Sequence, residues 1–179
     1  MTLSASSTDQ TLLVQPLNTK SFSCFGDVIE ARGEPDCWIN QGRCGRFHDR
    51  AQLDFAAGGR AGVSVFHGQP YTMPYRLGLV ERHPLGSQAF LPMSTDPFLV
   101  IVADDQHGVP GVPQAFATNG EQGVNLHRGV WHGVLSPIGR AARFAVIDWV
   151  GADPNLVEFE FDSPWLVTDP TGLLAIRYS

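Results

Sequence analysis

Two segments carry the side chains most able to do chemistry. Glu81, His83 and Gln88 lie in a stretch that otherwise reads as strand, turn and strand, and His127 and His132 follow later in the chain. Residues two apart on a strand face the same side, so Glu81 and His83 can point into one interior, where Gln88 can join them from the next strand. Two imidazoles and a carboxylate suit a first-row divalent metal such as nickel, manganese, iron or zinc. A neutral Gln is a weaker ligand than Glu, which predicts reduced affinity.

Other roles for the same residues stay open. The interior can instead bind an organic anion through Arg82, Arg128 and the histidines, without a metal. Each histidine can be a satisfied structural residue, and Glu81 can form a salt bridge on the wall of a barrel. If Glu81 and His83 point inward, the alternation of a strand turns Arg82 outward.

Composition excludes several classes of protein. The chain has 179 residues, of which 43% are hydrophobic and 17% charged, which fits one folded domain of ordinary size. A net charge of −6 without a basic run argues against a nucleic-acid partner. No apolar run is long enough to span a membrane, and the N-terminal residues lack the features of a signal peptide. The three cysteines, an odd number without a CxxC pair, indicate reduced thiols in a cytoplasmic protein.

Strand signals dominate the chain from residue 62 onward. Short alternating or fully apolar runs are separated by turn residues, with no long helical stretch between them, which predicts an all-β sandwich or barrel. Earlier in the chain, Asn18 or Thr19 can cap a short helix that carries Phe22 and Phe25. We expect one domain over residues 1–179.

The two ends of the chain are expected to differ from the body. Residues 1–11 are rich in Ser and Thr and are expected to form a flexible tail. Residues 157–161 alternate acidic and aromatic side chains like a strand, and residues 165–179 are expected to form an extension. This extension can pack on the body or on a second subunit.

The metal-ligand pattern resembles the cupin family of small jelly-roll barrels. The cupin motifs read His-x-His with a Glu five residues after the second His, and later Pro-x-Gly-x-x-His. His83 and His132 match, whereas Glu81 replaces the first His, Gln88 replaces the Glu and His127 replaces the Pro. The resemblance implies an all-β, cupin-like jelly-roll β-barrel with a few short helices and a metal held by Glu81, His83, Gln88 and His132.

Longer sequence motifs point to one family among the cupin-like proteins. The chain contains Glu-Arg-His-Pro-Leu-Gly-Ser-Gln at 81–88 and Asn-x-His-Arg-Gly-Val-Trp-His at 125–132. Shorter matches lie at 25–29, 39–42 and 46–49. Together they resemble the ureidoglycolate lyase family, from about Val14 to about Pro164. Membership would imply cleavage of (S)-ureidoglycolate to glyoxylate and urea in purine and allantoin degradation, a homodimer, and a divalent metal often given as nickel.

The chemistry of this substrate assigns roles to residue types. Collapse of the carbinolamide needs a base for the hydroxyl proton, an acid for the leaving urea nitrogen and a cation for the carboxylate. His127 is the first candidate for proton transfer and His48 the second, because the unperturbed pKa of imidazole lies near working pH. The other candidates bind substrate, as guanidinium partners of the carboxylate or amide partners of the urea group: Arg46, Arg82, Arg128, Asn40 and Asn125.

Three other functions remain open. The chain can be a non-catalytic cupin that binds a small organic acid, although His48 and His127 then lack a purpose. It can be a cupin isomerase or oxygenase, although an iron oxygenase needs a fuller His and carboxylate set than Gln88 provides. It can also be an amidohydrolase that releases ammonia from ureidoglycolate. Product analysis and oxygen uptake separate these functions.

Overall fold

The computed structural model describes residues 10–175 and is built almost wholly from β-strands. Most of the tail expected at 1–11 and the last part of the expected extension, 176–179, lie outside the described residues. In chain order the elements are β1 (Thr11–Pro16), α1 (Thr19–Phe22), β2 (Gly26–Ile29), β3 (Cys37–Ile39), β4 (Cys44–Arg46), β5 (Gly59–Gly68), β6 (Tyr75–Arg82), β7 (Gln88–Pro92), β8 (Phe98–Ala103), β9 (Asp105–Gln106), β10 (Val109–Pro110), β11 (Gln114–Ala117), β12 (Gly123–Leu126), β13 (Trp131–His132), β14 (Ser136–Pro137), β15 (Ala142–Gly151) and β16 (Val157–Thr168).

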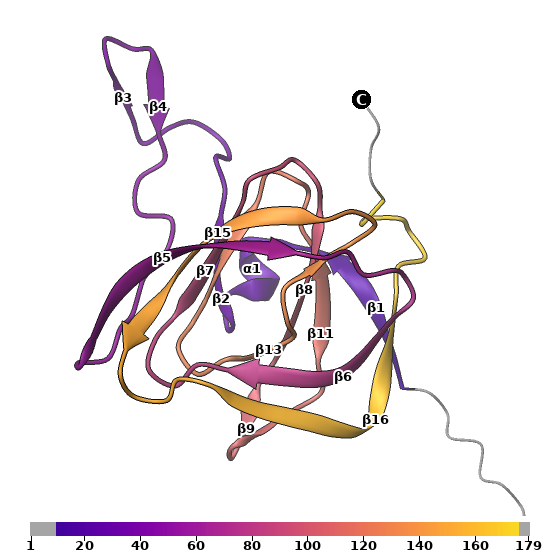
Figure 1. Cartoon of the computed structure of the whole chain (residues 1–179). Helices are drawn as coiled ribbons and strands as arrows, with labels where there is room; N and C mark the ends of the chain where they lie inside the picture. Colours follow the sequence, from indigo (N-terminus) through magenta and orange to yellow (C-terminus); the bar gives the residue numbers. More distant parts are fainter. Residues whose placement is uncertain (1–9, 176–179) are drawn as a thin grey trace, which may run out of the picture.

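Two large sheets build the body (Figure 1). The first has the order β11-β1-β16-β6-β13-β8-β14, and it closes into a barrel because β8 also pairs with β11. The second has the order β2-β12-β7-β15-β5. The expectation of an all-β, cupin-like barrel is therefore confirmed.

Strand alternation creates two hydrophobic cores. On β8, Val100 and Val102 face one core and Leu99 and Ile101 face the other, because successive side chains point to opposite faces. One core fills the closed barrel. The other lies between the first sheet and the inner face of the second, where Phe90, Val124, Leu126 and Val146 meet α1 and β8. The chemistry described below lies on the side of this second core.

The helix expected near residue 19 is present and short. Asn18 is extended at the N-cap, and its side chain accepts a hydrogen bond from the backbone N–H of Ser21 at 3.0 Å. Phe22 is fully buried from this single turn. At the other end of the chain, β16 continues through Trp165 to Thr168 and pairs with both β6 and β1, so these residues belong to the barrel wall.

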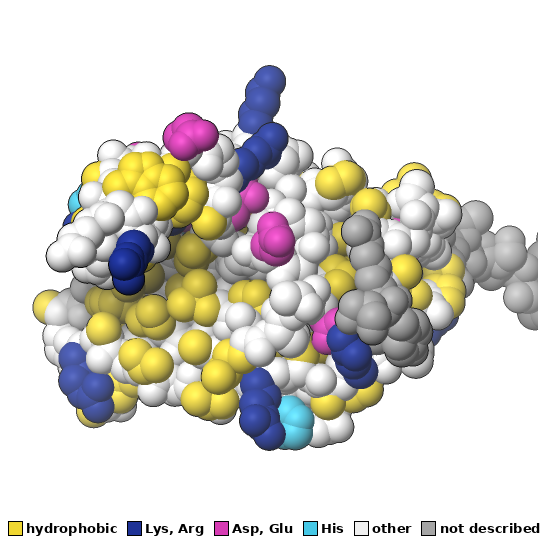
Figure 2. Space-filling model, turned by 90° about the horizontal axis from the view of Figure 1, so that it is seen from above, with side chains coloured by type: hydrophobic (Ala, Val, Ile, Leu, Met, Phe, Trp, Pro, Cys, Tyr) yellow, Lys and Arg dark blue, Asp and Glu magenta, His cyan; other side chains and the backbone are white. Residues whose placement is uncertain are grey.

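A small hairpin of β3 and β4 extends from the body (Figure 1). Within the described part of the chain its strands pair only with each other, and Trp38 on β3 is 60% exposed. The tip turns through Asn40 and Gln41, both with positive φ. Hydrophobic side chains gather on the neighbouring face of the body when the molecule is seen from above (Figure 2). Among the described residues, no helix is long and apolar enough to cross a membrane.

Candidate metal centre

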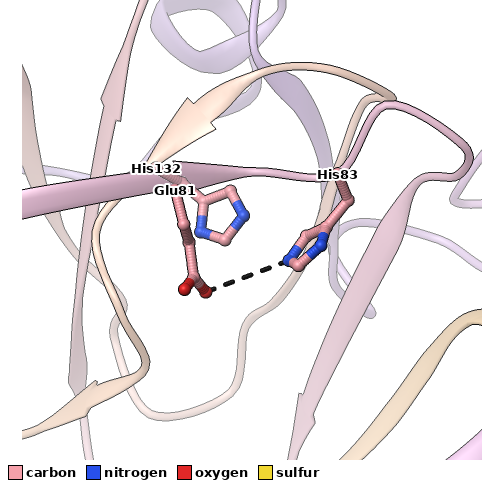
Figure 3. Close-up of side chains that lie close together, drawn as sticks. All are labelled: Glu81, His83 and His132. Atoms are coloured by element: carbon pink, nitrogen blue, oxygen red, sulfur yellow. Dashed lines mark ion pairs between the residues drawn. The ribbon is translucent and has the colours of Figure 1, made fainter. Parts of the chain in front are cut away.

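Glu81, His83 and His132, called here the ligand cluster, converge from two strands (Figure 3). Glu81 on β6 pairs directly with His132 on β13, so their side chains share one face of the sheet. His83 follows the end of β6 on the same side as Glu81. One ligand atom from each of the three residues lies within 4.8 Å of the others.

The two imidazoles of the ligand cluster are oriented through the same ring nitrogen. Nδ1 of His83 lies 2.6 Å from the backbone oxygen of Asn155, and Nδ1 of His132 lies 3.0 Å from the oxygen of Gly133. A carbonyl oxygen only accepts, so each Nδ1 carries the proton and each Nε2 presents a lone pair. Both Nε2 atoms are buried without a hydrogen-bond partner. This arrangement is typical of metal-ligating histidines.

Burial sets the protonation of the cluster. His132 is 3% exposed, and burial, followed by the nearby His83, lowers its pKa to about 3. Burial also raises the pKa of Glu81 above its usual range, partly opposed by His83 and reinforced by Glu158. His132 is therefore a neutral donor at physiological pH, which is the form that binds metals.

The pKa of His132 predicts a pH dependence of stability for metal-free protein. Below pH 6.5 the unfolded chain binds a proton that the folded protein does not bind until about pH 3. This group therefore removes about 1.4 kcal/mol of stability per pH unit as pH falls through that window. Glu81 affects the pH dependence of stability with the opposite sign, because its pKa is raised in the folded protein. The contribution of His132 is therefore measured as the difference between the original protein and His132→Gln. We expect urea unfolding between pH 7 and pH 4 to show a shallower loss for the variant, and equal slopes would contradict this.

Gln88 faces the same interior. It begins β7, pairs with Leu126 of β12 and lies on the same strand face as Phe90, both of which belong to the core between the sheets. It is 6% exposed, and its Oε1 is buried without a hydrogen-bond partner. A small apolar cavity of about 20 Å³ is lined by His132 together with Phe90 and Leu126, the residues that neighbour Gln88 on its strand face and across β12.

A divalent metal fits this set of donors. Two imidazole lone pairs, a carboxylate and an amide oxygen line one interior, and three of these groups have buried atoms without a partner. An unpaired buried polar atom costs free energy, which a bound cation would recover. The mixed nitrogen and oxygen set suits nickel, iron, manganese or zinc, and it does not select among them.

Arg82 lies on the opposite face of β6, as strand alternation predicts. Its Nη1 donates to Asp105 at 2.7 Å, and its guanidinium stacks 4.4 Å from the ring of Trp131. Asp105 also accepts from the indole N–H of Trp131 at 2.8 Å, which lowers the pKa of this carboxyl. The structure therefore places Arg82 behind the ligand cluster and not in it.

Three candidates lie on or beside the hairpin of β3 and β4. Asn40 forms its tip, Arg46 ends β4, and His48 follows. Arg46 Nη2 lies 2.8 Å from His48 Nδ1, and Asp36 accepts from the backbone N–H of His48. All three residues are exposed, and the structure does not bring them to the ligand cluster.

The remaining candidates meet on the outer face of the second sheet. Asn125 is fully buried, and its Nδ2 donates to Asp27, its direct partner on β2. His127 Nε2 lies 3.5 Å from the same carboxylate. Arg128 is ion-paired with Asp54 at 3.4 Å. None of the three belongs to the ligand cluster, although the chain next to Arg128 touches it, since the N–H of Gly129 donates to the backbone oxygen of His83.

Local sequence does not show that two further residues, Asn155 and Glu158, lie near the cluster. Asn155 lies in the loop between β15 and β16, and its two contacts reach residues 83 and 85. Glu158 pairs directly with Glu81 across β16 and β6. The alternation of acidic residues at 157–161 indicates which strand face Glu158 occupies, but only the pairing register shows that its neighbour is Glu81.

The large surface cleft of the protein does not coincide with the ligand cluster. A cleft of about 1130 Å³ lies elsewhere, between residues 30–33, 95–97, 117–122 and 171–175. Neither the ligand cluster nor Gln88 lines it. The buried polar side chain of Gln122 in its wall is hydrogen-bonded to Glu30 and to the backbone N–H of Asn119, so it offers no free ligand group.

Comparisons with known proteins point to one family. A family model described as ureidoglycolate lyase matches residues 9–168. The chain belongs to the ureidoglycolate lyase family. Relatives named ureidoglycolate lyase include one from Rhodobacter capsulatus, 54% identical over 87% of this chain and 97% of the relative, and one from Chelativorans sp., 48% identical over 89% and 97%. Ureidoglycolate lyase 2 from Rhizobium meliloti is 46% identical over 87% and 96%.

The match to the ureidoglycolate lyase family covers the whole site. Its last residue is Thr168, where β16 ends, and its range includes the ligand cluster, Gln88 and Asn155. The resemblance inferred from the strings at 81–88 and 125–132 is therefore confirmed at the level of the family.

Proposed function

We propose that this protein is a ureidoglycolate lyase that cleaves (S)-ureidoglycolate to glyoxylate and urea. The observation that carries the proposal is the ligand cluster, in which two buried imidazoles each present a free Nε2 lone pair. The chain that contains this cluster belongs to the ureidoglycolate lyase family. In this reaction the C–N bond breaks, the hydroxyl proton leaves as the aldehyde C=O forms, and the urea nitrogen gains a proton. The reaction consumes no water.

We further propose that Glu81, His83, His132 and Gln88 hold a divalent metal, with nickel as the first candidate. When bound, such a cation would neutralise the substrate carboxylate and lower the pKa of the substrate hydroxyl. The donor atoms proposed are the two Nε2 lone pairs, the Glu81 carboxylate and Gln88 Oε1. This proposal is supported by His83, His132 and Gln88, each of which has a buried donor atom without a hydrogen-bond partner among the described residues, and by the Glu81 carboxylate 3.9 Å from His83 Nε2.

Proton transfer is assigned to one of two residues. Glu158 is exposed and lies beside Glu81 on the same sheet face, which favours it as the carboxylate that exchanges protons with substrate. His127 has a carboxylate partner in Asp27, which favours it by chemistry although not by position. Glu158→Gln and His127→Gln should both keep metal affinity, and the variant that lowers kcat with KM unchanged identifies the group.

The substrate carboxylate is assigned first to Arg128. Its side chain is 42% exposed, its ion pair with Asp54 is loose at 3.4 Å, and the N–H of the adjoining Gly129 donates to the backbone oxygen of His83. Arg46 stays the secondary candidate for the carboxylate, and His48 stays the secondary candidate for proton transfer. Asn40 at the hairpin tip and Asn125 on the outer face stay candidates for the urea group. These four can act on substrate only if it extends beyond the ligand cluster.

Product analysis on freshly prepared (S)-ureidoglycolate is the experiment that tests the function. We expect urea and glyoxylate in equal amounts, above the rate of spontaneous decay, and no ammonia. Ammonia in place of urea would make the protein an amidohydrolase with a water nucleophile. Absence of turnover with retained ligand binding would favour a cupin that binds a small organic acid.

We also propose a cytoplasmic homodimer that acts in purine and allantoin degradation. Support for the dimer comes from β5, a ten-residue edge strand whose Val63 and Val65 are 75% and 65% exposed. Long, apolar edge strands are normally covered. Light scattering should give twice the chain mass, and Val63→Lys with Val65→Lys should give the monomer. Val112→Lys, at an equally exposed valine in a loop, is the matched control.

A further inference from the structure

Asn155 contacts the ligand cluster from a loop far away in sequence. Its backbone oxygen accepts from His83 Nδ1 at 2.6 Å, and its side-chain Oδ1 accepts from the backbone N–H of Leu85 at 2.7 Å. The two contacts lie on either side of Pro84. One residue therefore fixes both the imidazole of His83 and the chain that leads away from it.

The two histidines of the cluster differ in how they are held. The partner of His132 is the oxygen of the next residue, Gly133, so its orientation is local. The partner of His83 comes from the loop between β15 and β16. This loop is held against the 83–85 segment by the Oδ1 bond of Asn155, and without that bond the carbonyl can drift away from Nδ1.

The geometry points to Asn155 as a positioning residue whose carboxamide keeps the Nε2 lone pair of His83 aimed at the proposed metal. This inference rests on the proposed metal site, and it gives the 152–156 loop a role in setting affinity. Asn155 does not belong to the ligand cluster, and its contact with the cluster runs through His83. Changes to such supporting partners typically lower metal affinity by about 10- to 100-fold.

The test compares nickel affinities by calorimetry on full-length protein stripped of metal. Asn155→Ala removes the acceptor for Leu85, whereas Asn155→Asp keeps an oxygen at that position. We expect Asn155→Ala to bind nickel at least about tenfold more weakly, and Asn155→Asp to stay within about threefold of the original protein. Asn119→Ala is the matched control, because Asn119 also caps a loop N–H, that of Glu121, away from the cluster.

Equal nickel affinity of Asn155→Ala and the original protein would overturn the inference, and so would an Asn155→Asp variant as weak as Asn155→Ala. A fall in thermal stability with unchanged affinity would reduce Asn155 to a structural residue. If Asn155→Ala does not fold, Asn155→Ser replaces it, since the shorter side chain cannot span to Leu85.

A second measurement separates this inference from the metal proposal. If the original protein binds no divalent metal, the proposed metal site fails, and the tautomer of His83 in metal-free protein then decides the role of Asn155. Nitrogen NMR should show His83 protonated on Nδ1 in the original protein and a mixture of tautomers in Asn155→Ala. An unchanged tautomer would overturn the role of Asn155.

Discussion

Replacing His132 with alanine is expected to abolish metal binding and ureidoglycolate cleavage together. His132 is buried, its Nδ1 donates to the backbone oxygen of Gly133, and its Nε2 has no hydrogen-bond partner among residues 10–175. Removing a ligand should weaken nickel binding by more than about 100-fold, the upper end of what changes to supporting residues cause. Calorimetry and urea release, measured on the same preparation, check the prediction.

Stability and activity measured together separate a ligand from a core-filling histidine. The truncation also leaves a cavity, so a loss of about 1–3 kcal/mol in metal-free protein is expected whichever role is correct. His132→Gln keeps most of the volume and should recover stability without recovering activity. His107→Asn is the control, because His107 is exposed and its φ of 57° is tolerated by Asn. Near-normal metal content and activity in His132→Ala would remove it from the site.

Replacing Gln88 with glutamate is expected to trade stability for metal affinity. The new carboxylate would lie in the core between the sheets, where Gln88 is 6% exposed. Burial disfavours a charged carboxylate, so metal-free protein should lose about 3 kcal/mol at pH 8. A bound cation would pair with the charge, and nickel affinity should rise about tenfold or more, since carboxylate is the stronger ligand.

Urea unfolding with and without nickel measures both parts of the Gln88 prediction. The original protein should gain less stability from nickel than Gln88→Glu does, because tighter binding to the folded state stabilises it more. Gln15→Glu, at an exposed position on β1, is the matched control and should change neither quantity. Unchanged or weaker affinity in Gln88→Glu would show that residue 88 does not reach the metal.

Much of the ligand cluster could be predicted from local sequence because a strand has a period of two. Glu81 and His83 share a face for that reason, and Arg82 takes the other face, where it meets Asp105 and Trp131. The strings at 81–88 and 125–132 were enough to identify the family. The N-cap at Asn18 was also predictable, since capping depends on a few neighbouring residues.

The tertiary structure decided which of the other candidates join the cluster. His132 reaches Glu81 through the register of β13 on β6, whereas His127 lies on the outer face beside Asp27 and His48 lies beyond the hairpin. His83 depends on Asn155, and Glu81 has Glu158 as its neighbour, through contacts more than seventy residues apart in sequence. The sequence by itself determined the residue types, the strand faces and the family. The pairing register and the loop positions decided which of these residues form the ligand cluster. They arise only when distant strands bury their apolar faces together.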